Sequence, residues 1–125
     1  MRRSAVSLAA FVVLVAACGG GDREGRTVTT KAGGAVRVVA KEYSFDPSTI
    51  VVRGPGAVRF TLKNDGSLAH DIRVLNDGKA LGGTQPFPPG KSESATVRLE
   101  PGEYEFICTV GDHAELGMKG KLTVR

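Results

Sequence analysis

The sequence predicts an all-β fold, a Greek-key β-sandwich of about seven to eight strands. Short stretches alternate apolar and polar residues, as in 58–63 (Val-Arg-Phe-Thr-Leu-Lys) and 104–108 (Tyr-Glu-Phe-Ile-Cys). This period of two is typical of half-buried strands. Segments rich in Gly, Pro, Asn and Asp separate these stretches, as turns do. No stretch keeps a helical period, so regularly spaced short strands favour a sandwich.

The predicted strands follow one another at residues 36–43, 50–53, 58–63, 71–75, 95–99, 103–108 and 119–124. The turns between them are marked by Asp46-Pro47, Gly54-Pro55-Gly56, Asn64-Asp65-Gly66, Asn76-Asp77-Gly78, Pro88-Pro89-Gly90 and Pro101-Gly102. These residue types suit the backbone angles of tight turns. Residues 35–125 are therefore predicted to form one domain, which is large enough for a single core.

Residues 1–17 have the pattern of a signal peptide and are set apart from the fold. Arg2 and Arg3 precede an apolar run that is shorter than the roughly 20 residues needed to span a bilayer. The run ends in Val15-Ala16-Ala17-Cys18, which resembles a bacterial lipobox. We therefore expect cleavage before Cys18 and lipidation of that cysteine. Such a lipoprotein would be extracytoplasmic and anchored to the cell membrane, on its periplasmic or outer-wall side. The alternative is an ordinary signal peptide that ends beside a cysteine by chance.

Residues 18–34 are predicted to be a flexible tether, because glycine and charged residues dominate this segment. Loss of residues 1–17 removes two arginines and lowers the net charge from +4 to about +2. No basic cluster or stripe occurs, so nucleic acid is not expected as a partner. We expect a monomer at the membrane.

Four residues with metal-binding side chains stand out in the second half of the chain. Cys108, His113 and Met118 lie in one short segment, and His70 lies upstream. They include both histidines, the only methionine besides Met1 and the only cysteine besides Cys18. If Cys18 is lipidated, Cys108 has no disulfide partner in a compartment where disulfides are normal. Metal ligation would explain this unpaired thiol.

The spacing of these four donors favours a single metal site over separate structural roles. Taken singly, a histidine beside an apolar strand, a buried thiol or a core methionine is ordinary. Three of the donors, however, share the loop between the strands predicted at 103–108 and 119–124. His70 lies at the start of the strand predicted at 71–75 and adds a donor from the sheet. A thiolate, two imidazoles and a weak axial thioether are the ligands of blue-copper electron-transfer sites.

Four separated segments resemble the cupredoxins, the family of small blue copper proteins. These segments are 43–54 (Tyr-Ser-Phe-Asp-Pro and Ile-Val-Val-Arg-Gly), 60–71 (from Phe-Thr-Leu to His-Asp), 89–108 (Pro-Gly and Gly-Glu-Tyr-Glu-Phe-Ile-Cys) and 117–124 (Gly-Met-Lys-Gly-Lys-Leu-Thr-Val). The resemblance implies one copper ion that cycles between Cu(I) and Cu(II). It also implies that the ligands are His70, Cys108, His113 and Met118.

The resemblance further implies roles for residues around the ligands. Asp71 is expected to bond to the loop after Cys108, where Thr109 offers a hydroxyl, and an ionised Asp71 would favour Cu(II). The run Val110-Gly111-Asp112 lacks the proline that related loops often have before the second histidine. A small apolar surface around His113 is expected to receive redox partners. We call it the docking patch; its residues are Leu68, Ala69, Ala114, Leu116 and Gly117.

The predicted function is one-electron transfer by a mononuclear type 1 (blue) copper centre, and the protein is not expected to be an enzyme. Catalytic copper would need histidines beyond the two that the site already uses. Zinc bound by two histidines and a cysteine is chemically possible, but it would leave the thioether unused. Two alternatives remain: a copper-binding or copper-delivery lipoprotein without a redox partner, and a related fold in which the loop is merely structural.

Overall fold

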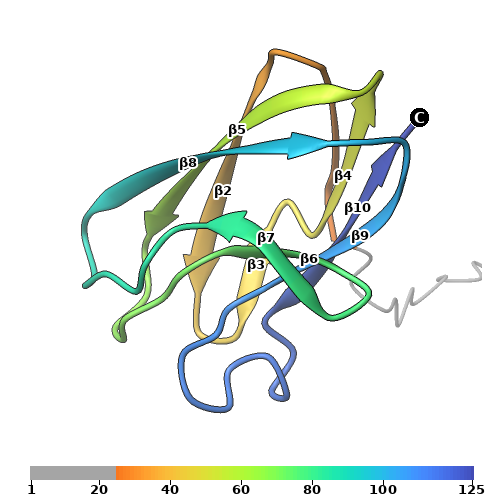
Figure 1. Ribbon diagram of the computed structural model, residues 1–125. Helices are drawn as coiled ribbons and strands as arrows, with labels where there is room; N and C mark the ends of the chain where they lie inside the picture. Colours follow the sequence, from red (N-terminus) through yellow and green to blue (C-terminus); the bar gives the residue numbers. More distant parts are fainter. Residues whose placement is uncertain (1–24) are drawn as a thin grey trace, which may run out of the picture.

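Ten β-strands in two sheets build the part of the chain that this computed structural model describes, residues 25–125 (Figure 1). The first sheet has six strands, in the spatial order β1 (Thr27–Lys31), β4 (Thr49–Arg53), β10 (Lys119–Val124), β9 (Gly102–Ile107), β6 (Arg73–Asn76) and β7 (Lys79–Gly83). The second has four, in the order β3 (Ser44–Asp46), β2 (Ala35–Lys41), β5 (Gly56–Asn64) and β8 (Ser92–Leu99). This all-β Greek-key sandwich confirms the predicted fold class.

The six-stranded sheet has parallel pairs on one side and antiparallel pairs on the other. Strand β4 pairs in parallel with both β1 and β10, whereas β10 runs antiparallel to β9, and β9 to β6. In the other sheet β2 is parallel to β5, which runs antiparallel to β8. Within residues 25–125 no helix is long and apolar enough to cross a membrane.

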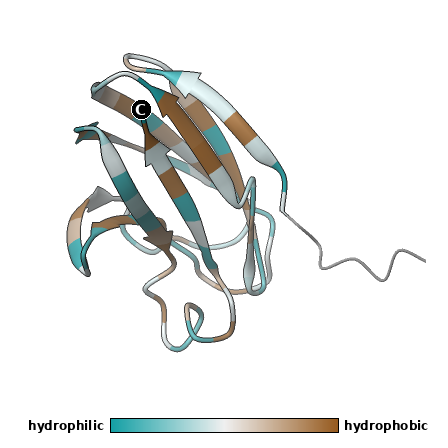
Figure 2. Ribbon diagram, turned by 90° about the vertical axis from the view of Figure 1, so that its right-hand side faces the viewer, coloured by the Kyte–Doolittle hydropathy of each residue, from teal (hydrophilic) through white to brown (hydrophobic). Residues whose placement is uncertain are grey.

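Alternating side chains from both sheets fill the core. In β2 the buried residues Val36, Val38 and Ala40 alternate with exposed or half-buried neighbours, and β5 repeats the pattern with Val58, Phe60 and Leu62. Figure 2 shows the resulting hydrophobic and hydrophilic bands along the strands. Burial of these inward faces is the main force that holds the two sheets together.

A glycine makes room for an aromatic contact in this core. Gly120 in β10 lies opposite Phe106 in β9. A Cβ built on Gly120 would overlap the Phe106 ring and lie 2.6 Å from the carbonyl oxygen of Ser48. The Phe106 ring also packs against Phe45 from the opposite sheet, with ring centroids 5.4 Å apart. Glycine at 120 therefore lets the two sheets close over this aromatic pair.

The structure corrects the predicted tether and several strand limits. Residues 27–31 were expected to be flexible, but they form β1 and pair with β4. Their β-branched sequence Thr-Val-Thr-Thr favours a strand, and neighbouring glycines hid that signal. The signal peptide predicted at 1–17 and Cys18 lie outside the described residues.

Two further corrections concern strand number and position. The strand predicted at 36–43 ends at Lys41 as β2, and a separate strand, β3, follows at Ser44–Asp46; neither β3 nor the Gly-rich β7 was predicted. The strand predicted at 71–75 begins later, as β6 at Arg73. His70 instead forms an isolated bridge with Phe87. His70 is thus held by backbone pairing with the segment that contains Phe87 and not by a strand.

Three connections gather at one end of the sandwich. They are the β9–β10 loop, the β2–β3 turn and the loop that follows β5 (Figure 1). The β9–β10 loop contains Cys108, His113 and Met118. The β2–β3 turn contains Glu42 and Tyr43, and the loop after β5 contains His70. The fold therefore brings together segments that are far apart in the sequence.

Candidate metal centre

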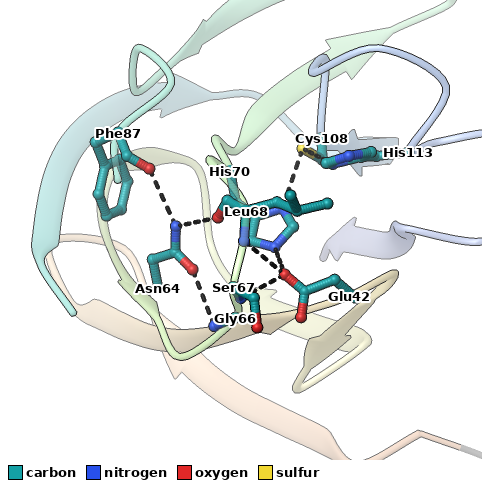
Figure 3. Close-up of polar contacts among 9 residues, drawn as sticks. All are labelled: Glu42, Asn64, Gly66, Ser67, Leu68, His70, Phe87, Cys108 and His113. Atoms are coloured by element: carbon teal, nitrogen blue, oxygen red, sulfur yellow. Dashed lines mark hydrogen bonds and ion pairs between the residues drawn. The ribbon is translucent and has the colours of Figure 1, made fainter. Parts of the chain in front are cut away.

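Three of the four predicted donor residues, His70, Cys108 and His113, lie close together and are buried. Cys108 Sγ lies 3.9 Å from His70 Nδ1 and 3.6 Å from His113 Nδ1 (Figure 3). All three donor atoms lie within 4.8 Å of one another. Cys108 and His70 are inaccessible or nearly so, and His113 is 6% exposed. His113 is therefore the most exposed of the three residues.

The separations fit ligands of one ion. Metal–nitrogen bonds of about 2.0 Å and metal–sulfur bonds of about 2.3 Å place two ligands of a tetrahedral or trigonal ion about 3.5–3.7 Å apart. The observed sulfur–nitrogen distances of 3.6 and 3.9 Å are close to that range. A thiolate with two imidazoles is a donor set for copper or zinc. The side-chain chemistry and spacing thus fit the copper that the sequence predicts.

The β9–β10 loop holds its donors through its own backbone. Cys108 N donates to the carbonyl oxygen of Met118 at 3.1 Å, and Met118 N donates to that of His113 at 3.0 Å. A further bond from His113 N to Val110 O at 3.0 Å closes a turn within the loop. Gly111 adopts a positive φ of 47° in this turn, where most other residues would be strained. The loop thus joins Cys108, His113 and Met118 by direct backbone hydrogen bonds.

Met118 lies in the core directly after this loop. Its side chain is fully buried, and its residue precedes β10 at Lys119. A buried thioether among apolar neighbours is an ordinary core residue, and it is also a soft donor suited to a weak axial bond. The loop predicted between the strands at 103–108 and 119–124 lies between β9 and β10, which the structure shows to be an antiparallel pair.

His70 is held by the segments on both sides of it. Its N–H donates to Phe87 O at 3.2 Å, and its carbonyl oxygen accepts from Phe87 N at 3.0 Å. The buried Asn64 side chain organises the preceding loop: its Nδ2 donates to Leu68 O at 2.9 Å and to Phe87 O at 3.0 Å. Its Oδ1 accepts from Gly66 N at 3.0 Å (Figure 3). These bonds fix the chain that carries His70.

Glu42 contacts the other nitrogen of His70, and sequence reasoning missed it. Glu42 Oε1 lies 3.2 Å from His70 Nε2 and accepts from Ser67 N at 2.6 Å and Leu68 N at 2.8 Å. The backbone N–H of Leu68, followed by that of Ser67, lowers the pKa of Glu42 to about 2, against a smaller opposing effect of desolvation. No sequence signal links residues 28 positions apart, so only the structure reveals this contact.

Tyr43, the next residue in the β2–β3 turn, contacts the second histidine. Its ring meets the His113 ring edge-on, with centroids 5.1 Å apart and an interplanar angle of 70°. Tyr43 is 37% exposed. Sequence reasoning treated Tyr43 only as part of a strand motif and did not place it at the site. The β2–β3 turn therefore touches both histidines.

Asp71 and Thr109 meet as expected from the resemblance. Asp71 is fully buried, and its Oδ1 accepts from Thr109 N at 2.6 Å. Its Oδ2 also accepts from the Thr109 hydroxyl. The carboxylate thereby ties the segment after His70 to the residue after Cys108.

Burial sets the protonation of the Cys108 thiol. Desolvation raises the pKa of Cys108 above its usual value, although the backbone N–H of Asp71 acts in the opposite direction. A metal binds the thiolate, so ion binding at this site must displace the thiol proton. Within residues 25–125 Cys108 forms no disulfide.

The docking patch residues flank this centre. Leu68 and Leu116 are 45% and 52% exposed, Ala69 and Gly117 are also exposed, and Ala114 is half-buried. Leu116 lies in the β9–β10 loop and Leu68 in the loop after β5, at the same end of the molecule (Figure 1). Two exposed leucines therefore lie in the two loops that carry His70 and His113.

Comparison with known proteins gives related sequences over most of the chain. A family model described as a cupredoxin-like domain matches residues 7–124. A copper-resistant cuproprotein, CopI of Rubrivivax gelatinosus, is 32% identical over 113 residues, which cover 76% of this chain and 68% of that protein. The iron uptake system component EfeO of Escherichia coli is 29% identical over 90 residues, 72% of this chain. The chain spans only 23% of the length of EfeO.

Solved structures share the same fold. Auracyanin from Roseiflexus castenholzii superposes with a TM-score of 0.68 at 23% identity, covering 75% of this chain and 98% of that one. Rusticyanin from Thiobacillus ferrooxidans has a TM-score of 0.63 at 23% identity, covering 82% and 86% of the two chains. The arrangement of the two sheets in this chain is therefore that of both proteins.

Proposed function

The chain belongs to the cupredoxin-like family, and on that premise we propose that it transfers single electrons through one copper ion. The ion would be held by the four donor residues defined above: His70, Cys108, His113 and Met118. Copper supplies the one-electron step by changing between Cu(I) and Cu(II). The observation that carries this proposal is the convergence of Cys108 Sγ with the Nδ1 atoms of both histidines.

The protein's part in this function is to keep the donors still. His70 is bonded to Phe87 through its backbone, and the β9–β10 loop is closed by the bonds between Cys108, His113 and Met118. Ligands held by the fold give similar surroundings to both copper oxidation states, which keeps the rearrangement during electron transfer small. Burial of the donors also excludes water from the site.

We propose that redox partners bind at the docking patch. His113 is the most exposed of the four donor residues, and the exposed Leu68 and Leu116 lie in the loops that carry His70 and His113. Small apolar surfaces suit the brief encounters of electron-transfer proteins. The exposed Asp112 and Glu115 in the same loop add negative charge, which favours a partner with a basic face.

The proposed location is the outer side of the cell membrane, with the domain anchored through a lipid on Cys18. The support is the sequence of residues 15–18 and the glycine-rich segment that follows. Mass spectrometry of the purified protein should find an acylated Cys18 at the N-terminus. A mature chain that begins elsewhere, or carries no lipid, would contradict the anchor and leave the copper proposal intact.

The second candidate function is copper binding or delivery without a redox partner. It uses the same donors, and the 32% identity to a copper-resistant cuproprotein favours it. The two functions differ in what the loaded protein does. An electron carrier keeps its copper through repeated oxidation and reduction, whereas a delivery protein releases Cu(I) readily to a chelator.

A redox titration of the copper-loaded protein, followed by visible absorption, tests the proposal. We expect an intense blue or green band from thiolate-to-Cu(II) charge transfer that disappears on reduction and returns on oxidation. The Cys108→Ser variant should lack the band because it lacks the thiolate. A colourless protein that exchanges Cu(I) rapidly would support delivery. A wild-type protein that binds no copper would overturn both functions.

A further inference from the structure

We propose that Glu42 is a positioning residue for the metal centre: its carboxylate holds the His70 imidazole in the tautomer and orientation that present Nδ1 to the ion. This inference rests on the proposed function, since it concerns the same centre. It adds a residue from a different segment, the β2–β3 turn, which precedes His70 by 28 positions. Three observations carry it.

The first observation is the convergence of three groups on one carboxylate oxygen. Glu42 Oε1 accepts from the backbone N–H groups of Ser67 and Leu68 at 2.6 and 2.8 Å, and it lies 3.2 Å from His70 Nε2 (Figure 3). Both amides belong to the loop that leads into His70. A single side chain therefore fixes the loop backbone and the ring that the loop presents.

The second observation is the direction of the hydrogen bond at His70. Glu42 Oε1 already accepts from two backbone N–H groups and is the acceptor in this pair as well, so the shared proton belongs to Nε2 of the imidazole. In a neutral imidazole the other nitrogen, Nδ1, then carries a free lone pair. Nδ1 is the atom that faces Cys108 Sγ. Glu42 thus selects the tautomer whose lone pair points to the other donors.

The third observation is the close packing of Gly66 against this pair. A Cβ at position 66 would lie 2.5 Å from Glu42 Oε1 and 2.6 Å from His70 Nε2. His70 is fully buried, although the Glu42 side chain is 29% exposed. The glycine backbone therefore covers the pair on one side, and no larger residue fits without moving the carboxylate.

The consequence for the metal is a stronger donor and a more tightly held ring. Carboxylate partners of metal-bound histidines fix the ring orientation and raise its basicity, and their loss typically costs about 10–100-fold in metal affinity. A more basic imidazole favours Cu(II) over Cu(I). Removal of the carboxylate should therefore weaken Cu(II) binding more than Cu(I) binding and raise the reduction potential.

The test uses two variants and one matched control. Glu42→Gln removes the charge and keeps the shape of the side chain. Gly66→Ala keeps every charge but displaces the carboxylate from His70. Asp65→Asn is the control, because Asp65 is an exposed acid in the same loop whose ion-pair partner is Lys63, at 3.5 Å. The Asp65→Asn substitution removes a negative charge from a side chain that does not contact His70.

Three measurements test the inference: the tautomer of His70, the Cu(II) affinity and the reduction potential. Nitrogen-15 NMR of the metal-free wild-type protein should show that Nε2 of His70 carries the proton. Glu42→Gln and Gly66→Ala should both lose about 10–100-fold in Cu(II) affinity, and Asp65→Asn should stay near wild type. Each tenfold loss of Cu(II) affinity in excess of the Cu(I) loss corresponds to a rise of about 59 mV in reduction potential.

The outcomes separate this inference from the proposed function. A proton on Nδ1 in the metal-free wild type, or a Glu42→Gln shift no larger than that of Asp65→Asn, would overturn the role of Glu42 even in a blue, reversible protein. If the wild type has no charge-transfer band, the proposed function fails. The tautomer of His70 in the metal-free protein then still decides the role of Glu42.

Discussion

Replacement of Asn64 by alanine removes the side chain that organises the loop before His70. The Asn64 amide is fully buried and makes three hydrogen bonds, to Leu68 O, Phe87 O and Gly66 N, at 2.9–3.0 Å. A buried hydrogen bond contributes a net of about 1 kcal/mol, so the three together give a loss of about 3 kcal/mol in the free energy of unfolding. For a domain of this size, that corresponds to a fall of about 12–24 °C in Tm.

Urea and thermal unfolding of the metal-free protein measure this loss. The control is Thr61→Ala, in the same strand β5, which removes an exposed hydrogen bond between Thr61 Oγ1 and Ser94 Oγ. An exposed substitution of this kind should change stability by no more than about 0.5 kcal/mol. Asn64→Ala should also weaken copper binding, because the loosened loop carries His70. A destabilisation below about 1 kcal/mol, with an unchanged urea m-value, would refute the assigned role of Asn64.

Three further changes test separate parts of the molecule. Asp71→Asn removes a buried negative charge beside the centre and should raise the reduction potential; an unchanged potential in optical titration would show that Asp71 does not tune the copper. Met118→Leu keeps the buried volume and should cost less than about 1.5 kcal/mol in chemical denaturation. It should also retain copper at a higher potential, and loss of the metal would show that the thioether is more than a weak ligand. Gly120→Ala should destabilise the fold by about 1–3 kcal/mol in urea unfolding, because its methyl group would overlap the Phe106 ring; wild-type stability would contradict that packing.

The fold class was predictable because strand alternation is a local property. Val58, Phe60 and Leu62 are separated by polar or small residues, and all three face the core as expected. The prediction failed where local composition misleads. Residues 27–31 lie among glycines and charges, yet they form β1 because β4 offers a free edge for parallel pairing. The Gly-rich β7 was missed for a similar reason, since β6 supplies its hydrogen-bond partners.

The sequence by itself indicated the four candidate donors, because residues 25–125 contain no other histidine, cysteine or methionine. It also indicated that three of them share one loop, since the flanking strands could be recognised. The tertiary structure decided what surrounds each donor. Glu42 reaches His70 across 28 positions because β2 pairs with β5, and Asp71 reaches Thr109 across 38 because β6 pairs with β9. Such contacts depend on which distant strands pair within each sheet, and no local pattern of residues encodes them.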